Sequence, residues 1–322
     1  MDVCPVYKVK KTETSVLRGK FLQILGLIRG ELKYDKKIAY NLDLCLGCNK
    51  CKNACPSGID AVKIFSIMRE KHQSVFERAF YCAPSFKLKM LAIKILYKFK
   101  YAFRQRKTKT IINGENIGYF RGCATRAFGV GLNLKQGKFK CCGLPFYIKG
   151  RRDLYEKYKA HNIKLIEKYD KVVFDCATCF DTVLNYEGVD KNKLLYFTDF
   201  YKDKRLSYKK PIVISFHKPC HLSYEKFIEI ENILENIENV QYKRLENYDD
   251  CCGFGGDFFT RHIKTASSLS IKKIENVLNT KTDAILTTCP TCLWSLKYGI
   301  KAKKAHIKAF DLVEFLGNCE VL

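Results

Sequence analysis

The sequence contains no stretch that approaches the ~20 uncharged apolar residues of a membrane-spanning helix. Residues 1–8 contain no apolar core of the kind that a secretory signal peptide needs. There is no low-complexity tract either, and 47% of the 322 residues are apolar, so the chain is expected to be globular. These absences predict a cytoplasmic protein, in which thiols stay reduced and closely spaced cysteines indicate metal binding rather than disulfides.

Motifs for hydride transfer, phosphate binding and hydrolysis are also missing. The glycines at 253, 255 and 256 do not follow the G-x-G-x-x-G pattern, so no dinucleotide site is expected; they let the backbone pass close to another group. No P-loop, Ser-His-Asp order or pair of carboxylates stands out. Without a flavin or nicotinamide site, the chain is not expected to oxidise an organic substrate by hydride removal on its own.

Acidic residues are scarce: 33 Asp and Glu stand against 58 Lys and Arg, a formal net charge of +25. The basic residues are spread along the chain and no nucleic-acid-binding module is found, so no nucleic-acid partner is predicted. A general lysine bias explains the charge, and attraction to an anionic membrane or an acidic partner subunit is the functional alternative. Residues 86–109 form a basic amphipathic pattern that suits either a membrane interface or docking on the protein itself.

Cysteine, in contrast, is abundant, with 17 residues. Two copies of one pattern each contain a single cysteine, an adjacent pair followed by glycine, and a C-x-x-C pair. Neighbouring cysteines are poor disulfide partners because the bridge strains the backbone, whereas two thiolates can serve one metal centre. A pattern that occurs twice is an internal repeat and predicts two metal–thiolate sites. The residues are Cys123, Cys141, Cys142, Cys176 and Cys179 in repeat 1, and Cys220, Cys251, Cys252, Cys289 and Cys292 in repeat 2.

A third group, Cys45, Cys48, Cys51 and Cys55 before Pro56, is the C-x2-C-x2-C-x3-C-P run of [4Fe–4S] ferredoxins. Three closely spaced thiolates on a tight loop can reach three corners of one cubane. A structural zinc ion would be satisfied by two C-x2-C pairs and does not need this run. The run therefore predicts one [4Fe–4S] cluster.

The fourth ligand of this cluster stays open between Cys4 and Cys55. Cys4 precedes Pro5, like the tail of a first run whose other three cysteines are missing, and in two-cluster ferredoxins the fourth cysteine ligates the other cluster. On that interpretation Cys4 completes the site and Cys55 is left without a cluster. The simpler alternative closes the cubane with Cys55 and leaves Cys4 free. A start codon annotated too late would produce the same sequence.

Both repeats alternate strand-like and helix-like segments with cysteines. Short apolar runs at 117–120, 172–174, 212–214 and 284–286 each precede a cysteine, which predicts α/β units with their ligands at strand ends. We expect a mixed fold: a small α-helical ferredoxin-like segment, with a helix at 16–28, followed by two α/β units in a pseudo-twofold arrangement. The expected boundaries are 1–80 for the ferredoxin-like segment, 81–112 for a basic linker, 113–208 for repeat 1 and 209–322 for repeat 2.

The first repeat is shorter than the second. Only 17 residues separate Cys123 from Cys141, against 30 between Cys220 and Cys251, so about one helix is missing. Whether repeat 1 holds metal therefore stays open. His217 and His221 flank Cys220 near a strand end, where hydrogen bonding is favoured over a role as ligand or proton donor. Cys82 and Cys319 fit no motif and are expected to be ordinary side chains.

These patterns together resemble the duplicated cysteine-rich (CCG) domain family, here preceded by a ferredoxin-type segment. The order is similar to that in the iron–sulfur subunit of glycolate oxidase. The family also includes a subunit of anaerobic glycerol-3-phosphate dehydrogenase, the lactate-utilisation iron–sulfur proteins and the CCG subunits of heterodisulfide reductase. The resemblance is carried by Cys45 to Gly58, Gly122-Cys123, Cys141 to Gly143, Cys176 and Cys179, His217 to His221, Cys251 to Gly256, and Cys289 and Cys292.

The resemblance implies that the repeat 2 cysteines hold a second [4Fe–4S] centre, of the noncubane type in heterodisulfide reductase. It further implies a non-flavin subunit of an oxidoreductase complex. Such a subunit would carry electrons from a flavoprotein that oxidises a 2-hydroxy acid such as glycolate or lactate toward quinone, and would lie peripherally on the inner face of the cytoplasmic membrane. Two alternatives remain: a thiol/disulfide redox enzyme like heterodisulfide reductase, and a zinc-stabilised scaffold without redox chemistry.

Overall fold

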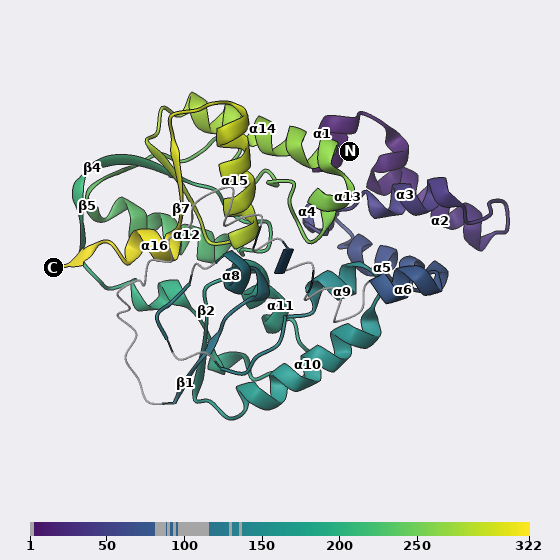
Figure 1. Ribbon diagram of the computed structural model, residues 1–322, viewed down its shortest axis with the longest axis horizontal. Coiled ribbons are helices and arrows are strands. Elements are labelled where there is room, and N and C mark those ends of the chain that lie inside the picture. The colour runs from purple at the N-terminus through teal and green to yellow at the C-terminus, as the bar shows by residue number, and fades with distance from the viewer. Residues whose placement is uncertain are drawn as a thin grey trace.

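The computed structural model describes residues 3–80, 116–128, 131–134 and 137–322, together with positions 88, 91, 92 and 95. A helical N-terminal part lies beside two α/β units, and the C-terminus lies at the opposite end of the molecule (Figure 1). The basic linker expected at 81–112, including Cys82, falls almost entirely outside the described residues. Among the described residues no helix combines the length and apolar character needed to span a bilayer.

The N-terminal part is helical, as the sequence predicts for residues 1–80. The helix expected at 16–28 is confirmed by α2, and Ile24, Leu42 and Phe65 are buried between α2, α3 and α5. Asp35 begins α3 because its carboxylate accepts a hydrogen bond from the backbone N–H of Ile38 at 2.8 Å. The elements are α1 (Pro5–Lys10), η1 (Glu13–Ser15), α2 (Leu17–Ile28), α3 (Lys36–Asp43), α4 (Lys50–Asn53), α5 (Ala61–His72) and α6 (Val75–Phe80).

The first α/β unit contains a parallel sheet in the order β1-β2-β3. Its strands are β1 (Ile117–Phe120), β2 (Lys171–Phe174) and β3 (Leu194–Tyr196), which confirms the strands predicted at 117–120 and 172–174. The helices are α8 (Cys123–Phe128), α9 (Leu144–Ile148), α10 (Arg152–Ile166), α11 (Ala177–Leu184), η2 (Lys191–Lys193) and η3 (Phe197–Phe200). Val172, Val173 and Phe174 are fully buried because helices and loops cover both faces of a parallel sheet.

The second α/β unit has a larger sheet in the order β5-β4-β6-β7, all parallel, with β8 antiparallel to the start of β4. The strands are β4 (Leu206–Phe216), β5 (Ile237–Tyr242), β6 (Ala284–Thr287), β7 (Lys308–Asp311) and β8 (Glu320–Val321). The helices are α12 (Tyr224–Glu235), α13 (Phe258–Arg261), α14 (Ile263–Asn279), α15 (Pro290–Ala302) and α16 (Leu312–Leu316). The strands predicted at 212–214 and 284–286 are confirmed, although β4 is much longer than expected.

The length difference between the repeats has a structural counterpart. In repeat 2 the residues between Cys220 and Cys251 form α12 and the edge strand β5. The described residues between Cys123 and Cys141 contain only the short helix α8 and no strand. Among the described residues, repeat 1 therefore has a shorter helix at this place than repeat 2 and no counterpart of the edge strand β5.

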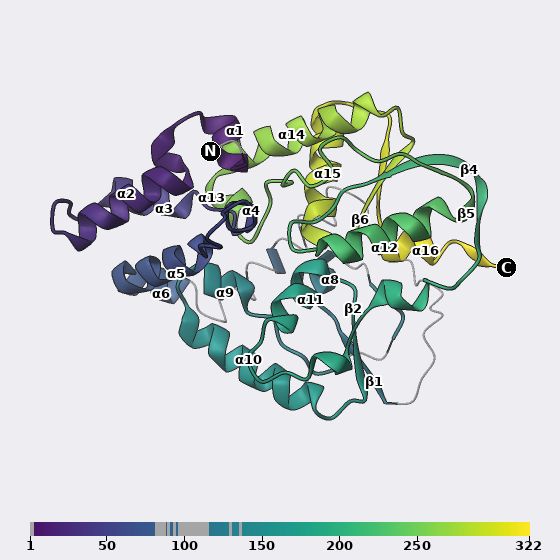
Figure 2. The ribbon, with the colours of Figure 1, turned by 180° about the vertical axis from the view of Figure 1, so that it is seen from behind.

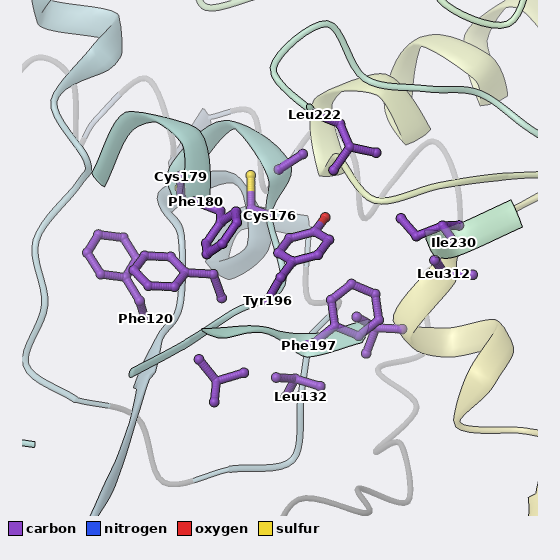
Figure 3. Packing of buried hydrophobic residues seen from close by; sticks show 14 of the residues in the cluster. Phe120, Leu132, Cys176, Cys179, Phe180, Tyr196, Phe197, Leu222, Ile230 and Leu312 are labelled. Atoms are coloured by element: carbon purple, nitrogen blue, oxygen red, sulfur yellow. The ribbon is translucent and has the colours of Figure 1, made fainter. Parts of the chain in front are cut away.

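The two α/β units share one hydrophobic core. Figure 3 shows Phe197 and Leu132 of the first unit in the same packed group as Leu222, Ile230 and Leu312 of the second. Burial of such side chains stabilises the fold by about 1.5–3 kcal/mol each. This continuous core holds the two units against each other.

A buried ionic cluster attaches the N-terminal part to both units. Asp43 at the end of α3 accepts from Lys149 Nζ at 2.6 Å, Arg261 Nε at 2.8 Å and His262 Nε2 at 2.8 Å. Lys149 also contacts Asp257 at 3.0 Å. Burial alone would raise the pKa of Asp43, but the His262 hydrogen bond and the surrounding cations hold it well below its usual range. In both views α1 runs beside α14, which adds an apolar contact to this junction (Figures 1 and 2).

Candidate metal centres

The repeat cysteines lie where parallel strands end. Cys123 and Cys176 follow β1 and β2, and Cys220 and Cys289 follow β4 and β6. Carboxyl ends of parallel strands meet at one edge of a sheet, so each sheet gathers its own cysteines there. Cys176 and Cys289 are also the N-cap residues of α11 and α15. The N-terminal end of a helix carries partial positive charge, which favours thiolates and anionic groups.

The Cys-Cys-Gly segments adopt the same local geometry in both repeats. Gly143 and Gly253 have φ angles of 85° and 84°, which L side chains rarely adopt. Their N–H groups donate to the sulfurs of Cys141 and Cys251, each at 3.5 Å. A Cβ on Gly253 would lie 2.7 Å from the Leu269 Cβ, so space as well as φ requires glycine.

The carbonyl of the second cysteine in each pair also has a fixed partner. Tyr186 Oη donates to the Cys142 carbonyl at 2.7 Å, and Ser295 Oγ donates to the Cys252 carbonyl at 2.6 Å. These contacts orient the two adjacent thiols of each pair without using the sulfur atoms.

The five thiols of repeat 2 are brought together as predicted. Cys220 donates a hydrogen bond to Cys251, Cys251 donates to Cys252, and Cys292 donates to both Cys252 and Cys289. The bond from Cys251 lowers the pKa of Cys252 well below its usual value, and the bond to Cys252 raises that of Cys292. All except Cys220 are buried. A buried group of closely spaced thiols suits metal ligation.

The five thiols of repeat 1 form an equivalent group despite the shortening. Cys141 donates to Cys123 across 3.7 Å between sulfurs, and also to Cys142. Cys179 donates to Cys142 and Cys176. The Cys141 bond lowers the pKa of Cys142 well below its usual value. The shortening of repeat 1 therefore does not separate these side chains.

The two repeat groups touch each other. The Cys176 thiol donates a hydrogen bond to Cys289, which lowers the pKa of Cys289. The Ala177 N–H donates to the Thr288 carbonyl at 3.2 Å beside this contact. Thr178 Oγ1 lies 3.9 Å from the Cys289 sulfur. The start of α11 in repeat 1 therefore faces the start of α15 in repeat 2.

The ferredoxin-like segment gathers Cys4 rather than Cys55. A cavity of about 40 Å³ is lined by Cys4, Cys45, Cys48, Cys51 and Lys20, among other residues, but not by Cys55. The sulfur of Cys55 lies away from this group, near the backbone N–H groups of Ile59, Ser57 and Gly58, which lower its pKa. Of the two alternatives that the sequence leaves open, the geometry favours Cys4.

Lys20 supplies a positive charge beside these four thiols. Its side chain is 2% exposed, and its ammonium group donates to the Leu44 carbonyl at 2.5 Å. Burial lowers the pKa of Lys20, whereas the nearby sulfurs of Cys45 and Cys4 oppose that shift. The sequence motifs did not single out this residue. The sequence feature that could have identified Lys20 is its position as a lone lysine, one turn before Ile24, on the apolar side of a predicted helix.

The ferredoxin-like group also touches repeat 2. Cys48 donates a hydrogen bond to Cys251, which raises the pKa of Cys48. The loops pack closely there: a Cβ on Gly255 would lie 3.0 Å from the Leu46 carbonyl oxygen. Glycine at this position therefore permits the close approach that the sequence predicts for residues 253–256.

The two histidines beside Cys220 differ. His221 Nδ1 lies 3.1 Å from Asp181 Oδ2 on α11, which confirms the predicted hydrogen-bonding role. For His217 it stays a prediction: the side chain is buried and the ring lies near the Tyr248 carbonyl, but no ring hydrogen bond of normal geometry is found among the described residues. Burial lowers the pKa of His217 well below its usual value. Cys319 lies near the C-terminus, apart from the three groups, and contacts the Phe315 carbonyl.

The donor sets fit iron–sulfur groups. Each set consists of four or five thiols, the usual ligands of iron–sulfur clusters. Lys20, the helix N-termini and the N–H groups of Gly143 and Gly253 supply the positive charge and N–H donors that an anionic cluster requires. When bound, such clusters accept and release single electrons.

Comparison with known families supports these assignments of the segments. The cysteine-rich domain (CCG) family matches residues 117–183 and 214–297, and the 4Fe-4S dicluster domain family matches residues 1–59. The matched ranges contain every cysteine of the three groups.

Two of the curated relatives are named as subunits of reductases, and a third is named for lactate utilization. A subunit of the CoM/CoB fumarate reductase of Methanothermobacter marburgensis is 29% identical over 63% of this chain and 46% of its own length. A subunit of the dihydromethanophenazine:CoB–CoM heterodisulfide reductase of Methanosarcina barkeri is 25% identical over 85% of this chain and 76% of its own. Lactate utilization protein A of Bacillus cereus is 23% identical over 55% of this chain and 82% of its own.

The chain spans between about half and two thirds of the length of the first curated relatives it matches. Among solved structures, a hypothetical protein from Helicobacter pylori shares the fold with a TM-score of 0.52 and 10% identity, covering 92% of this chain and 66% of that one. This likeness concerns the fold alone.

Proposed function

The chain belongs to the iron–sulfur proteins with a duplicated cysteine-rich (CCG) domain and carries a [4Fe–4S] centre, and on this premise we propose that it is an electron-transfer subunit of a larger redox complex. The observation that carries the proposal is the contact between the three thiol groups. Cys48 is hydrogen-bonded to Cys251, and Cys176 to Cys289. Clusters held by these groups would lie next to one another, which favours a path for single electrons.

We assign Cys4, Cys45, Cys48 and Cys51 as ligands of the ferredoxin-type cluster, since these four line one cavity. The repeat 2 cysteines are proposed to hold a second iron–sulfur centre of the noncubane type, and the repeat 1 cysteines a third.

The electron donor in this proposal is a flavoprotein subunit that oxidises a 2-hydroxy acid of the glycolate or lactate type, and the acceptor is quinone. The similarity to lactate utilization protein A supports this substrate class. The net charge of +25 would promote docking on an acidic partner or on the anionic inner face of the membrane. The equivalent Cys-Cys-Gly turns and the Cys176–Cys289 contact support a pseudo-twofold relation of the two units.

The test is anaerobic purification with iron, acid-labile sulfide and zinc counted per chain, followed by electron paramagnetic resonance. Cys45→Ser should abolish the signal of the ferredoxin-type cluster, and Cys252→Ser should remove a distinct one. The reduced protein should be reoxidised by a soluble quinone analogue. Zinc without sulfide would instead show the non-redox scaffold.

A second candidate is reduction of a disulfide. Two relatives are named for CoB and CoM chemistry, and the two repeat groups meet at Cys176 and Cys289. In this reaction one S–S bond breaks, two electrons and two protons are taken up, and two thiols form. Reoxidation of the reduced protein by a disulfide, with release of free thiol and without response to quinone, would favour this candidate over the first.

A further inference from the structure

His217 lies directly against the thiols of repeat 2. It follows β4 and is 1% exposed. One ring nitrogen and the sulfurs of Cys252 and Cys292 all lie within 4.8 Å of one another. The imidazole therefore lines the same site as these thiols.

The Tyr248 carbonyl lies near the ring and also accepts from the Lys218 N–H at 3.1 Å. Neither ring nitrogen makes a hydrogen bond of normal geometry within the described part of the chain. The carbonyl can serve only one of the two nitrogens, so the other is left without a hydrogen-bond partner. A buried polar atom without a partner points to a group that fills the site.

Among its described residues, repeat 1 has no equivalent side chain. The residue that follows β1, as His217 follows β4, is Arg121, whose guanidinium cannot lose its proton and cannot bind a metal. The two five-thiol groups are otherwise alike in their turns and hydrogen bonds. The imidazole is thus the feature that distinguishes the repeat 2 site chemically.

We propose that His217 is a sixth ligand residue of repeat 2, with one ring nitrogen coordinating the metal centre that Cys220, Cys251, Cys252, Cys289 and Cys292 hold. This rests on the proposed function only in assuming that the centre contains iron. Metal-binding histidines commonly direct their other nitrogen at a backbone carbonyl, a role open to Tyr248. A nitrogen donor among the sulfur ligands changes the reduction potential of an iron–sulfur centre relative to an all-sulfur site.

The experiment uses the full chain, purified anaerobically and labelled with ¹⁵N-histidine, and measures nitrogen hyperfine coupling to the repeat 2 signal. Coupling from one histidine is expected in the wild-type protein and complete loss of it in His217→Gln. The midpoint potential of the repeat 2 signal should shift in this variant, while the ferredoxin-type signal stays unchanged. His221→Gln is the matched control and should retain the coupling, because His221 bonds to Asp181.

The remaining outcomes also decide the proposal. Unchanged coupling and potential in His217→Gln, with iron intact, would overturn it and leave the proposed function standing. If repeat 2 held zinc, X-ray absorption showing one nitrogen among sulfur donors, lost in His217→Gln, would support the ligand and contradict the redox function. Repeat 2 free of any metal would overturn both. A thermal melt and a second variant, His217→Ala, guard against misfolding of either one.

Discussion

At the scale of single residues, the two cysteines that the sequence leaves open as the fourth ligand, Cys4 and Cys55, have different surroundings. Cys4 shares a cavity with Cys45, Cys48 and Cys51, whereas Cys55 lies outside it. Burial raises the pKa of Cys4, with backbone N–H groups and Lys20 opposing the shift, as expected for a thiol that sits among other donors. The packing of α1 against the loop therefore favours Cys4 over the cysteine that the local C-x3-C spacing offers.

This predicts opposite effects of two conservative substitutions. Cys4→Ser should lose the [4Fe–4S] signal of the ferredoxin-type site and the iron that goes with it. Cys55→Ser should keep both, because its sulfur does not face the other three. Iron analysis and electron paramagnetic resonance of the two variants, prepared side by side, measure this. The reverse pattern would restore the simple ferredoxin ligand set.

At the scale of elements, the junction of α3, α9 and α13 depends on one carboxylate. The Asp43 side chain is 10% exposed and contacts Lys149, Arg261 and His262. Removing one member of a buried ionic cluster leaves the charges of the other members uncompensated, which destabilises the fold. A half-exposed ion pair, in contrast, contributes little to stability. The buried Asp43 cluster, rather than ion pairs at the surface, is therefore the main ionic attachment of the ferredoxin-like helices to the α/β units.

Asp43→Asn should lower the free energy of unfolding by about 3 kcal/mol and make the N-terminal part more sensitive to proteolysis. Glu70→Gln is the matched control: it removes a partner of Arg152 at 3.7 Å on the surface and should cost less than about 1 kcal/mol. Denaturant unfolding of the holoprotein measures both. Equal effects in the two variants would show that the buried cluster does not hold this junction.

A second element contact makes stability depend on pH. Asp199 caps η3 by accepting from the Tyr196 N–H at 2.8 Å and pairs with Lys226 and Lys202. Burial would raise its pKa, but the two lysines lower it below the usual value. Because the folded pKa is depressed, the stabilisation is present above about pH 4 and is lost as the pH falls further.

Asp199→Asn should therefore cost about 1 kcal/mol at pH 6 to 7, allowing for partial exposure, and the difference from wild type should shrink between about pH 4 and 3. Thermal melts across this range measure it. Asp203→Asn, at an exposed position nearby, should show no such trend. A constant difference at every pH would mean that the cap, rather than the charge, accounts for the effect.

At the scale of the whole molecule, the three thiol groups form one connected set within the fold. Hydrogen bonds between sulfurs lead from Cys48 through repeat 2 to repeat 1. The shared core behind them holds the two sheets together. Clusters bound here would contact several elements at once, so their loss should weaken the fold as a whole.

Removal of iron by an anaerobic chelator should lower the melting temperature by roughly 5–10 °C, because bound clusters stabilise only the folded chain. Reconstitution with iron and sulfide should restore it. Differential scanning calorimetry before removal, after removal and after reconstitution provides the measurement. An unchanged melting temperature in iron-free protein would show that the thiol groups fold without help from metal.

The sequence by itself determined the chemistry: the cysteine spacings define three donor groups, and alternating strands and cysteines predict the parallel sheets. Only the tertiary structure favours Cys4 over Cys55, gathers the repeat 1 thiols, sets Lys20 beside the ferredoxin-type site and leaves His217 facing Cys252 and Cys292. The physical reason is the separation along the sequence of the residues that make each contact. Ligand spacing and strand periodicity are local properties of the chain, whereas these four outcomes depend on contacts between segments far apart in sequence.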